Sequence, residues 1–512
     1  NNYRTFTSSP EKFPYPEEMF SQLHNSGFKC STNITGIISA NPLDENGNRY
    51  TPYPTRDSIV SISEDNQISV NSDKMVPFIY NTREGRGESP ELFIANENYG
   101  DNNGFNPNKY PTPMFPDGQN SLGTYGFYSD MGREDVQKWW GQQYDYLLSL
   151  GLDMVWQDMT CPAVVPNLDN ETPDKTLPLN LMMTDTVSDE YKANAEIHNA
   201  FALNLIKATW NGISELRNSK IYKNSEADSN GFNGRAYNYK KRSFIIARGG
   251  YAGVHRYAAS WTGDSASSWD FLKINIPEVL NFGLSGQPMS GCDVGGFAVG
   301  SGSEGGGVTN YELFTRWMTM SAFLPWFRNH YDGYVKTFQE PYRYAEPVAS
   351  NCRKYIEIRY RLIQLFYDAM YQNTQNGLPV ARALFVNDPN DPEVYNHVND
   401  QFFVGDSLLI APVVDQGSVN RSIYLPKGSQ WYVYSDNTKP LGGPTDGGTT
   451  QSWYVPLSLV PMYVREGAVL PHRELEQYIG ELDSNPITFN IYPGKDTTYT
   501  LYQDDHVSTD NV

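Results

Sequence analysis

The fold of this chain is decided by residues 151–160, which read GLDMVWQDMT. The middle of this stretch, from Leu152 to Trp156, is short and mostly apolar, and the carboxylate of Asp158 follows it. That pattern is typical of a buried parallel strand that presents one charged group at its C-terminal end. We therefore predict a strand here and treat Asp158 as a candidate catalytic residue. The alternative is that Asp158 only caps the next element.

A helix is predicted directly before this strand. Apolar residues recur there at helical spacing, namely Val136, Trp140, Tyr144, Leu147 and Leu148. Glu134 and Asp135 fall in the first turn, where acidic groups are favourable, and Gly151 occupies the position that commonly ends a helix. Helix, glycine, strand and acid make one α/β unit. In a (β/α)8 barrel, the strand ends of such units form the active-site face.

Four later residues are further candidates, two of them on predicted strands. Residues 243–248 form an apolar run that ends at Arg248, and residues 288–296 form a strand that contains Asp293. Asp264 precedes a predicted helix at about 267–282, and it is either a reactive carboxylate or that helix's N-cap. His330 follows a helix and is either a site residue or an ordinary satisfied histidine. All four are therefore candidates for the same face.

Length and composition limit the class of protein. The chain has 512 residues, so we expect about two to four domains. It carries 59 acidic and 39 basic residues, a net charge of −20, and no basic run, so nucleic acid is not an expected partner. No apolar stretch reaches about 18 residues, so no membrane partner is expected either. The four cysteines and seven histidines lack the spacing of a disulfide framework or a metal site, and we predict no metal and no cofactor.

The pattern of elements predicts three parts. Residues 1–385 are predicted to form a barrel, with excursions at about 40–126 and 161–187. Residues 386–474 alternate apolar and polar residues between turns, which indicates a β-sandwich, and residues 475–512 resemble the start of a further β domain.

Individual elements are predicted within these parts. We expect long helices at about 189–216 and 351–372, and short β segments at 58–62 and 499–502.

Two carboxylates at separate strand ends, with an arginine, a histidine and many aromatic rings, match the chemistry of glycoside cleavage. One carboxylate attacks or stabilises the anomeric carbon, and the other protonates the leaving oxygen. Aromatic residues make up 14% of the chain, and their rings are suitable stacking platforms for sugars. We therefore expect a carbohydrate substrate. A non-catalytic carbohydrate-binding protein remains an alternative of a different class.

Five motifs, in order, resemble those of glycoside hydrolase family 31, the α-glucosidase and α-xylosidase family. They are WQDM at 156–159, the stretch from Arg248 through AGVHRYA to WTGD at 261–264, GCDVGGF at 291–297, FRNH at 327–330 and PMYVREGA at 461–468. The resemblance spans nearly the whole chain. It implies a (β/α)8 TIM barrel followed by C-terminal β-sandwich domains. It also implies that the family's first barrel strands lie upstream of this sequence.

The resemblance also implies roles for individual residues. Asp158 would be the nucleophile, and Asp264 would be the general acid and then the general base. Eight further residues would hold or line the pocket for the sugar whose bond is cleaved: Arg248, His330, Asp293, Trp156, Met159, Trp261, Phe297 and Phe327.

Two departures from typical α-glucosidases affect the expected reaction. Thr160 and Cys161 stand where those enzymes have Asn-Glu, and Asn33-Ile34-Thr35 replaces an Asp-Pro. These variants resemble two neighbouring branches, the α-1,4-glucan lyases and the bacterial glucosyl- or isomaltosyltransferases acting on starch fragments. We predict glycosyl transfer from an α-glucan or malto-oligosaccharide to a sugar acceptor, with lyase and hydrolase activity as alternatives. We also expect a missing N-terminal segment of the same protein, and secretion directed by it.

Aromatic residues in the first excursion offer a possible basis for transfer. Tyr110, Phe115, Tyr125, Phe127 and Tyr128 are candidates for a surface on which an acceptor sugar stacks. The alternative is that these rings pack the excursion's own core.

Overall fold

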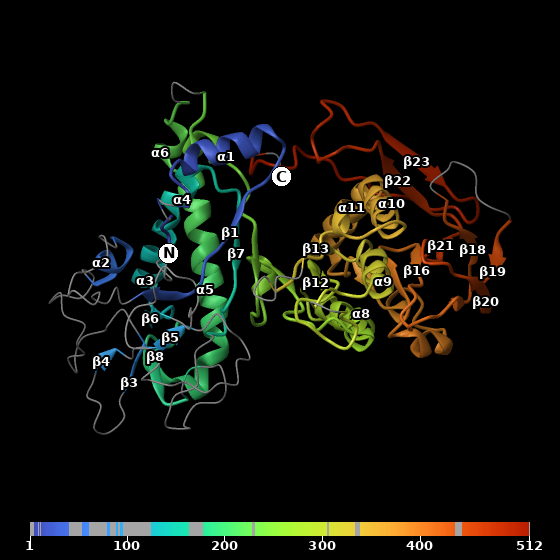
Figure 1. Ribbon diagram of the computed structural model, residues 1–512, viewed down its shortest axis with the longest axis horizontal. Helices are drawn as coiled ribbons and strands as arrows, with labels where there is room; N and C mark the ends of the chain where they lie inside the picture. Colours follow the sequence, from blue (N-terminus) through green and yellow to red (C-terminus); the bar gives the residue numbers. More distant parts are fainter. Residues whose placement is uncertain are drawn as a thin grey trace. The chain divides into compact units, whose positions relative to one another are not determined.

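A computed structural model describes residues 5–8, 10, 12–39, 54–60, 79–81, 89–90, 93–95, 124–162, 177, 179–227, 231–304, 307–332, 338–435 and 443–510. The chain divides into two units (Figure 1). The first unit comprises Asn1–Ala258 and Asp505–Val512, and the second comprises Ala259–Asp504. None of the described helices is both long and apolar enough to cross a membrane.

Three parallel strands organise the first unit. β7 (Met154–Gln157) lies between β1 (Ser31–Asn33) and β10 (Ile245–Ala247), and both neighbours pair with it in parallel. Val155 is fully buried, as expected for a strand covered by helices. The long helix α5 (Asn194–Arg217) runs beside β1 and β7 in Figure 1. The strands predicted around residues 152–156 and 243–248 are therefore confirmed.

The helix predicted before β7 is two helices. α3 (Glu134–Gln142) and α4 (Tyr144–Leu150) meet at Gln143, and Gly151 ends α4 in the left-handed conformation with φ 110°. The five apolar residues predicted for the core face are all buried.

The first unit contains further helices, of which α1 (Pro16–Asn25) precedes β1 in the chain. The remaining short helices are α6 (Lys220–Lys223), α7 (Gly234–Asn238) and the 3₁₀ turn η1 (Val254–Arg256).

Described parts of the two excursions form antiparallel sheets. One contains β2 (Ile37–Ser39), β6 (Thr124–Tyr128) and β5 (Phe93–Ala95). The other contains β4 (Ser89–Pro90), β3 (Tyr80–Asn81), β8 (Leu181–Thr184) and β9 (Tyr191–Ala193). Tyr80 pairs with Met182, so both excursions contribute to the second sheet. Because β9 pairs with β8, α5 begins only at Asn194 instead of near residue 189.

The β segment predicted at 58–62 is wrong in its described part, because α2 (Pro54–Val60) is a helix whose Ile59 is fully buried. Phe127 and Tyr128 lie in the hydrophobic core of the first unit, with exposed fractions of 7% and 0%. These two rings therefore pack the unit's own core. Tyr110 and Phe115 lie outside the described residues, as does the Tyr125 side chain.

The second unit begins with three more parallel strands. These are β11 (Ala259–Trp261), β12 (Ser290–Val294) and β13 (Trp326–Asn329), with β12 in the middle. The helices that follow in the chain are α8 (Trp269–Leu284), α9 (Tyr311–Ser321), η3 (Pro341–Arg343), α10 (Val348–Arg361) and α11 (Ile363–Asn376). Their apolar faces and the strands share one core. The helix predicted at 351–372 is thus two helices, α10 and α11, which meet at Leu362.

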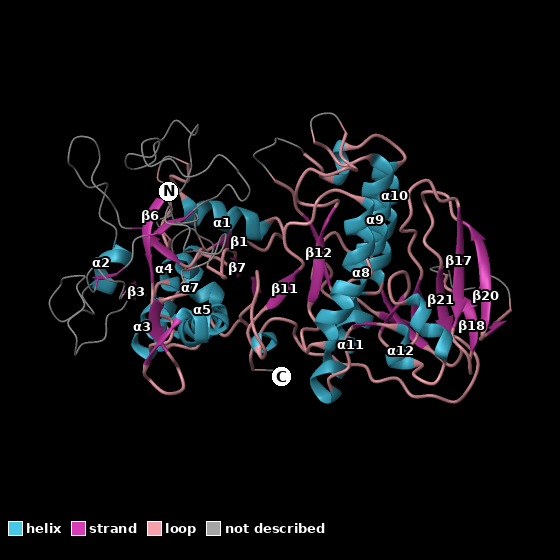
Figure 2. Ribbon diagram, turned by 90° about the horizontal axis from the view of Figure 1, so that it is seen from below, coloured by secondary structure: helices cyan, strands magenta, loops and turns pink. Residues whose placement is uncertain are grey.

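The C-terminal part of the second unit is a β-sandwich. One sheet has the order β14-β15-β16-β21-β18-β19, and the antiparallel pair β17–β20 faces it across a core that contains Trp431 and Tyr463 (Figure 2). The strand bounds are β14 (Ala381–Arg382), β15 (Phe402–Val404), β16 (Leu408–Ile410), β17 (Asn420–Leu425), β18 (Gln430–Val433), β19 (Thr445–Asp446), β20 (Thr449–Tyr454) and β21 (Met462–Arg465). Between β14 and β15 lie α12 (Leu384–Asn387) and η4 (Pro392–His397). The predicted sandwich signature is borne out by these strands.

The last two strands of the described residues pair with each other, β22 (Val469–Arg473) with β23 (Ile487–Ile491). The β segment predicted at 499–502 is not a strand. Tyr499 and Tyr502 instead bind Asp368 on α11, through the Tyr499 hydroxyl and the Tyr502 amide. The domain boundaries predicted at 385 and 474 stay predictions.

Candidate active site

Asp158 follows β7 directly, at the C-terminal end of the parallel strands. Its Oδ1 accepts hydrogen bonds from the Arg248 guanidinium and, at 2.8 Å, from the backbone N–H of Met159. No described residue donates a hydrogen bond to Oδ2. The Asp158 side chain is 11% exposed. One carboxylate oxygen is therefore fixed, and the other has lone pairs available for a ligand.

Strand pairing explains why Arg248 reaches Asp158. Ala247 is the register partner of Gln157, and the Arg248 N–H donates to the Gln157 carbonyl at 2.9 Å. The next residue on each strand therefore stands at the same edge. The Thr160 hydroxyl donates to the Arg248 carbonyl and ties the two strand ends together. The ion pair is well shielded, with side-chain exposures of 20% for Arg248 and 11% for Asp158.

Met159 and Trp156 flank the carboxylate. Met159 has φ 58°, a left-handed conformation that is unfavourable for a residue with a side chain and is concentrated at functional sites. The N–H of this residue donates to Asp158 Oδ1. In β7 the Gln157 side chain donates to the Thr209 hydroxyl of α5 at 2.8 Å. Because side chains alternate along a strand, Trp156 faces the opposite side of the sheet.

Asp264 lies in the second unit, in the turn after β11. The strand's path continues through Thr262, whose N–H donates to the Gly291 carbonyl at 3.0 Å, and Gly263 then turns the chain with φ 78°. Asp264 is partly exposed. The N-cap of α8 is Ser268, whose hydroxyl accepts from the Phe271 N–H at 3.2 Å. The alternative that Asp264 caps this helix is therefore wrong.

Asp293 is fully buried in β12, and its partner is Arg328, which was not among the predicted site residues. Arg328 donates from Nε at 2.8 Å and from a terminal nitrogen at 2.6 Å, both to Asp293 Oδ1. Asp293 and Arg328 are register partners on adjacent strands. The Arg328 guanidinium also lies over the Trp261 ring, 4.9 Å from its centre. Three strands of the second unit are thus joined at one end.

His330 and Phe297 form a second contact at that end. Their rings stack at a centroid distance of 5.2 Å and an interplanar angle of 29°. Gly296, directly before Phe297, packs closely against the backbone of Ser267. An added Cβ at Gly296 would lie 2.6 Å from the Ser267 backbone nitrogen, so only glycine permits this close approach.

Phe327 has other partners. It packs against the hydrophobic core, and the Arg359 guanidinium lies 5.3 Å from its ring centre. A sugar contact of Phe327 stays a prediction.

Each unit therefore brings together part of the predicted set. The first unit groups Trp156, Asp158, Met159 and Arg248 at the C-terminal ends of β7 and β10. The second unit places Trp261, Asp264, Asp293, Phe297 and His330 at or after the C-terminal ends of its strands, with Arg328 in addition. Arg328 could have been predicted as a site residue from its place in the FRNH motif, two residues before His330. Carboxylates, arginines and aromatic rings at the C-terminal ends of parallel strands are typical of TIM-barrel glycosidases.

The chain belongs to glycoside hydrolase family 31. The family's TIM-barrel domain matches residues 1–369, and its C-terminal domain matches residues 377–470. These matches confirm the predicted barrel and the C-terminal β domain that follows it.

Among curated relatives, Alpha-glucosidase 2 of Bacillus thermoamyloliquefaciens is 33% identical over 381 residues, covering 74% of this chain and 42% of that protein. Among solved structures, the α-1,4-glucan lyase of Gracilariopsis lemaneiformis has 29% identity and a TM-score of 0.71, covering 93% of this chain and 45% of that one. The GH31 dextranase of Flavobacterium johnsoniae has 26% identity and a TM-score of 0.71, covering 97% and 50%. The chain thus spans about half the length of these proteins or less.

Proposed function

We propose that this protein cleaves α-glucosidic bonds with retention of configuration, through a covalent glycosyl ester on Asp158. The supporting observation is the asymmetric environment of that carboxylate. Arg248 and the Met159 N–H hold Oδ1, whereas no described residue donates to Oδ2. A nucleophilic carboxylate needs one oxygen with an available lone pair and a fixed orientation. Arg248 keeps the charge compensated without covering the attacking oxygen.

Asp264 supplies the proton. In the first step its carboxylic acid protonates the leaving oxygen, and the anomeric carbon bonds to Asp158 Oδ2 as the glycosidic bond breaks. In the second step the Asp264 carboxylate removes the proton from an incoming hydroxyl, whose oxygen bonds to the anomeric carbon as the ester bond to Asp158 breaks. The partial exposure of Asp264, and the capping of α8 by Ser268 instead, support this role.

The remaining residues bind the sugar. Asp293 is fixed by Arg328 and accepts hydrogen bonds from sugar hydroxyls, while Trp261, Trp156 and Phe297 give apolar surface for the ring. His330 is held against Phe297 and donates to a hydroxyl. Hydrogen bonds of this kind stabilise the charged transition state more than the ground state.

Among possible fates of the glycosyl ester, we propose transfer to a sugar hydroxyl, with α-1,4-glucan or malto-oligosaccharide as the donor. Thr160 and Cys161 after the nucleophile support a branch other than the typical hydrolases. Elimination to 1,5-anhydrofructose is the second candidate, because an α-1,4-glucan lyase is among the similar structures at 29% identity. Secretion from the cell stays a prediction, which fractionation of the producing cells would test.

Two experiments test the proposal. Incubation with 5-fluoro-α-glucosyl fluoride, followed by peptide mapping, should find the label on Asp158, and a label elsewhere would refute the nucleophile assignment. Incubation with maltopentaose and product analysis by NMR separates the fates. Longer or differently linked glucosides support transfer. Mainly 1,5-anhydrofructose would establish the lyase, and glucose alone the hydrolase.

A further inference from the structure

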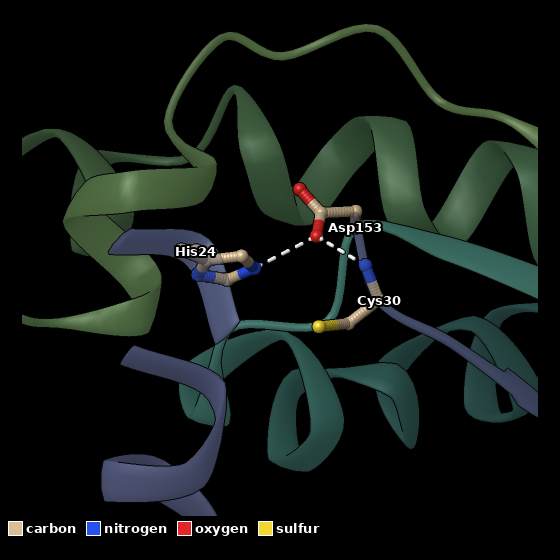
Figure 3. Close-up of side chains that lie close together, drawn as sticks. All are labelled: His24, Cys30 and Asp153. Carbon is tan, nitrogen blue, oxygen red and sulfur yellow. Dashed lines mark hydrogen bonds and ion pairs between the residues drawn. The ribbon is translucent and has the colours of Figure 1, made fainter. Parts of the chain in front are cut away.

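The other end of the parallel strands in the first unit holds a cluster that the proposed reaction does not use. His24 of α1, Cys30 before β1 and Asp153 before β7 each direct one ligand atom toward the others (Figure 3). These three atoms lie within 4.8 Å of one another. Asp158 follows the same strand at its opposite end. We propose that His24, Cys30 and Asp153 form a binding site for Zn²⁺.

The donor set decides the type of ion. Imidazole nitrogen, thiolate sulfur and carboxylate oxygen together suit Zn²⁺, which bonds to each of them at about 2.0 to 2.3 Å in a tetrahedron. Alkaline-earth ions prefer oxygen ligands alone. The thiolate and the carboxylate carry two negative charges, which a dication neutralises. Three protein ligands leave the fourth position to water.

The carboxylate is already positioned for this role. Asp153 Oδ2 accepts from His24 Nε2 at 2.8 Å and from the Cys30 N–H at 2.8 Å (Figure 3). Its other oxygen accepts from the Tyr237 hydroxyl at 2.6 Å. A partner on the non-coordinating oxygen is the kind of outer contact that orients metal ligands. Oδ2 therefore stays directed at His24 and Cys30.

The imidazole and the thiol are also held in place. The His24 ring stacks on Tyr237, with a centroid distance of 4.2 Å and an interplanar angle of 17°, and its side chain is 7% exposed. Cys30 is 8% exposed, and no described residue hydrogen-bonds its sulfur. A buried ligand set needs little further ordering when an ion enters. Residues from three separate segments thus converge on one shielded point.

Binding has costs that limit its strength. The Cys30 S–H bond breaks and its proton passes to solvent, and burial raises the pKa of this thiol to about 11. The proton on His24 Nε2 moves to Nδ1, which has no hydrogen-bond partner among the described residues. A nearby amine, Lys241 Nζ, lies 3.9 Å from Asp153 Oδ1 and 2.8 Å from the centre of the Tyr237 ring. We expect weaker binding than at a closed four-ligand zinc site.

Co²⁺ is the probe for the test, because its spectrum reports both geometry and sulfur ligation. The metal-free protein should develop a sulfur-to-cobalt charge-transfer band and tetrahedral d–d bands, which Zn²⁺ then removes. Cys30→Ser should lose the charge-transfer band, and His24→Gln should weaken binding by about tenfold or more. The matched control is Cys161→Ser, because Cys161 is an exposed thiol in the same unit. Its spectrum should equal that of the unchanged protein.

Three outcomes would overturn the site: no charge-transfer band, a band that survives in Cys30→Ser, or a band that disappears in Cys161→Ser. If Cys30→Ser does not fold, three measurements on the unchanged protein test the site. These are the charge-transfer band, its loss when Zn²⁺ is added, and the rise in melting temperature that binding to the folded state requires. At the ordinary assay temperature, glycosidase activity should be the same with and without a chelator. Failure of the metal site would therefore leave the proposed function untouched.

Discussion

Two aspartates at opposite ends of strand β7 differ in how completely the protein surrounds them. Asp153, before the strand, accepts hydrogen bonds from His24, the Cys30 amide and Tyr237, and Lys241 lies 3.9 Å away. Among the described residues, Asp158, after the strand, has only Arg248 and the Met159 amide as donors, both on the same oxygen. The two side chains are almost equally buried, 10% and 11% exposed. Burial alone therefore does not distinguish a structural carboxylate from a reactive one.

What distinguishes them is the use of lone pairs. A carboxylate whose oxygens are all occupied by donors is stabilised as an anion and contributes to folding. A carboxylate with one unoccupied oxygen has a position left for an electrophilic carbon. Local strain agrees with this assignment, because Met159 beside Asp158 has φ 58°. The comparison predicts that equal substitutions at the two ends have opposite effects on activity and stability.

The largest effect is expected for Asp158→Asn. An amide cannot form the glycosyl ester at a useful rate, so kcat on maltopentaose should fall by roughly a thousandfold or more. The melting temperature should change little, because only the ion pair to Arg248 is lost and an amide oxygen can still accept from the Met159 N–H. Steady-state kinetics and calorimetry on the same preparation measure both. Residual activity above about a hundredth of the original, with reversion excluded, contradicts the assignment.

The next largest effect is expected for Asp264→Ala, whose kcat on maltose should fall by about a hundredfold or more. General-acid help matters least when the leaving group is already acidic, so α-glucosyl fluoride should restore much of the first step. The ratio of the two losses is the quantity to measure. Equal losses on maltose and on the fluoride would move the acid role to another residue.

Asp153→Asn should show the reverse pattern. The amide cannot accept all three hydrogen bonds, and one of its own donors would face the Cys30 N–H or the Tyr237 hydroxyl. The free energy of unfolding should fall by about 2 to 4 kcal/mol, measured by denaturant titration in the presence of a chelator. The kcat of the folded protein should stay within a few-fold of the original. A loss of activity comparable to that of Asp158→Asn would break the comparison.

The sequence could predict one end of β7 better than the other. Asp158 and Arg248 each follow a short apolar run, so strand patterning and parallel topology place them at one edge of the first unit's strands. Asp293 lies near the end of its predicted strand in the second unit. The environment of Asp153 depends on His24, Cys30 and Tyr237, which come from segments with no pattern linking them to the strand. Long-range partners of this kind have no local signature. The same reason explains why Arg328 was missed as the partner of Asp293.

Helix ends were also predicted less well than helix faces. The buried face of α3 and α4 follows from apolar spacing, but the break at Gln143 does not. α5 starts late because Tyr191–Ala193 pairs with β8, a tertiary contact that overrides helix propensity. The helix α2 in place of a predicted strand reflects the ambiguity of short apolar runs such as Ile59-Val60.

Arg248→Lys sharpens the comparison at the reactive end. Lysine keeps the charge, but it lacks the guanidinium Nε that donates to Asp158 Oδ1 and the terminal nitrogens that we propose for a sugar hydroxyl. We expect kcat/KM to fall by about 2 kcal/mol, roughly thirtyfold, with little change in melting temperature. A loss confined to KM would indicate that Arg248 binds substrate without stabilising the transition state.

The smallest effect is expected for Tyr237→Phe, at the other end of the strand. This change removes only the hydroxyl that donates to Asp153 Oδ1 at 2.6 Å. The phenyl ring keeps its stacking on His24 and its contact with the Lys241 ammonium. A hydrogen bond to a shielded carboxylate contributes about 1.5 to 3 kcal/mol, and Lys241 remains to compensate part of the exposed charge. We therefore expect a loss of roughly 1 to 2 kcal/mol in the free energy of unfolding and unchanged kcat on maltopentaose. An unchanged stability would mean that Oδ1 needs no donor, and Asp153 would then resemble Asp158 in having an oxygen to spare.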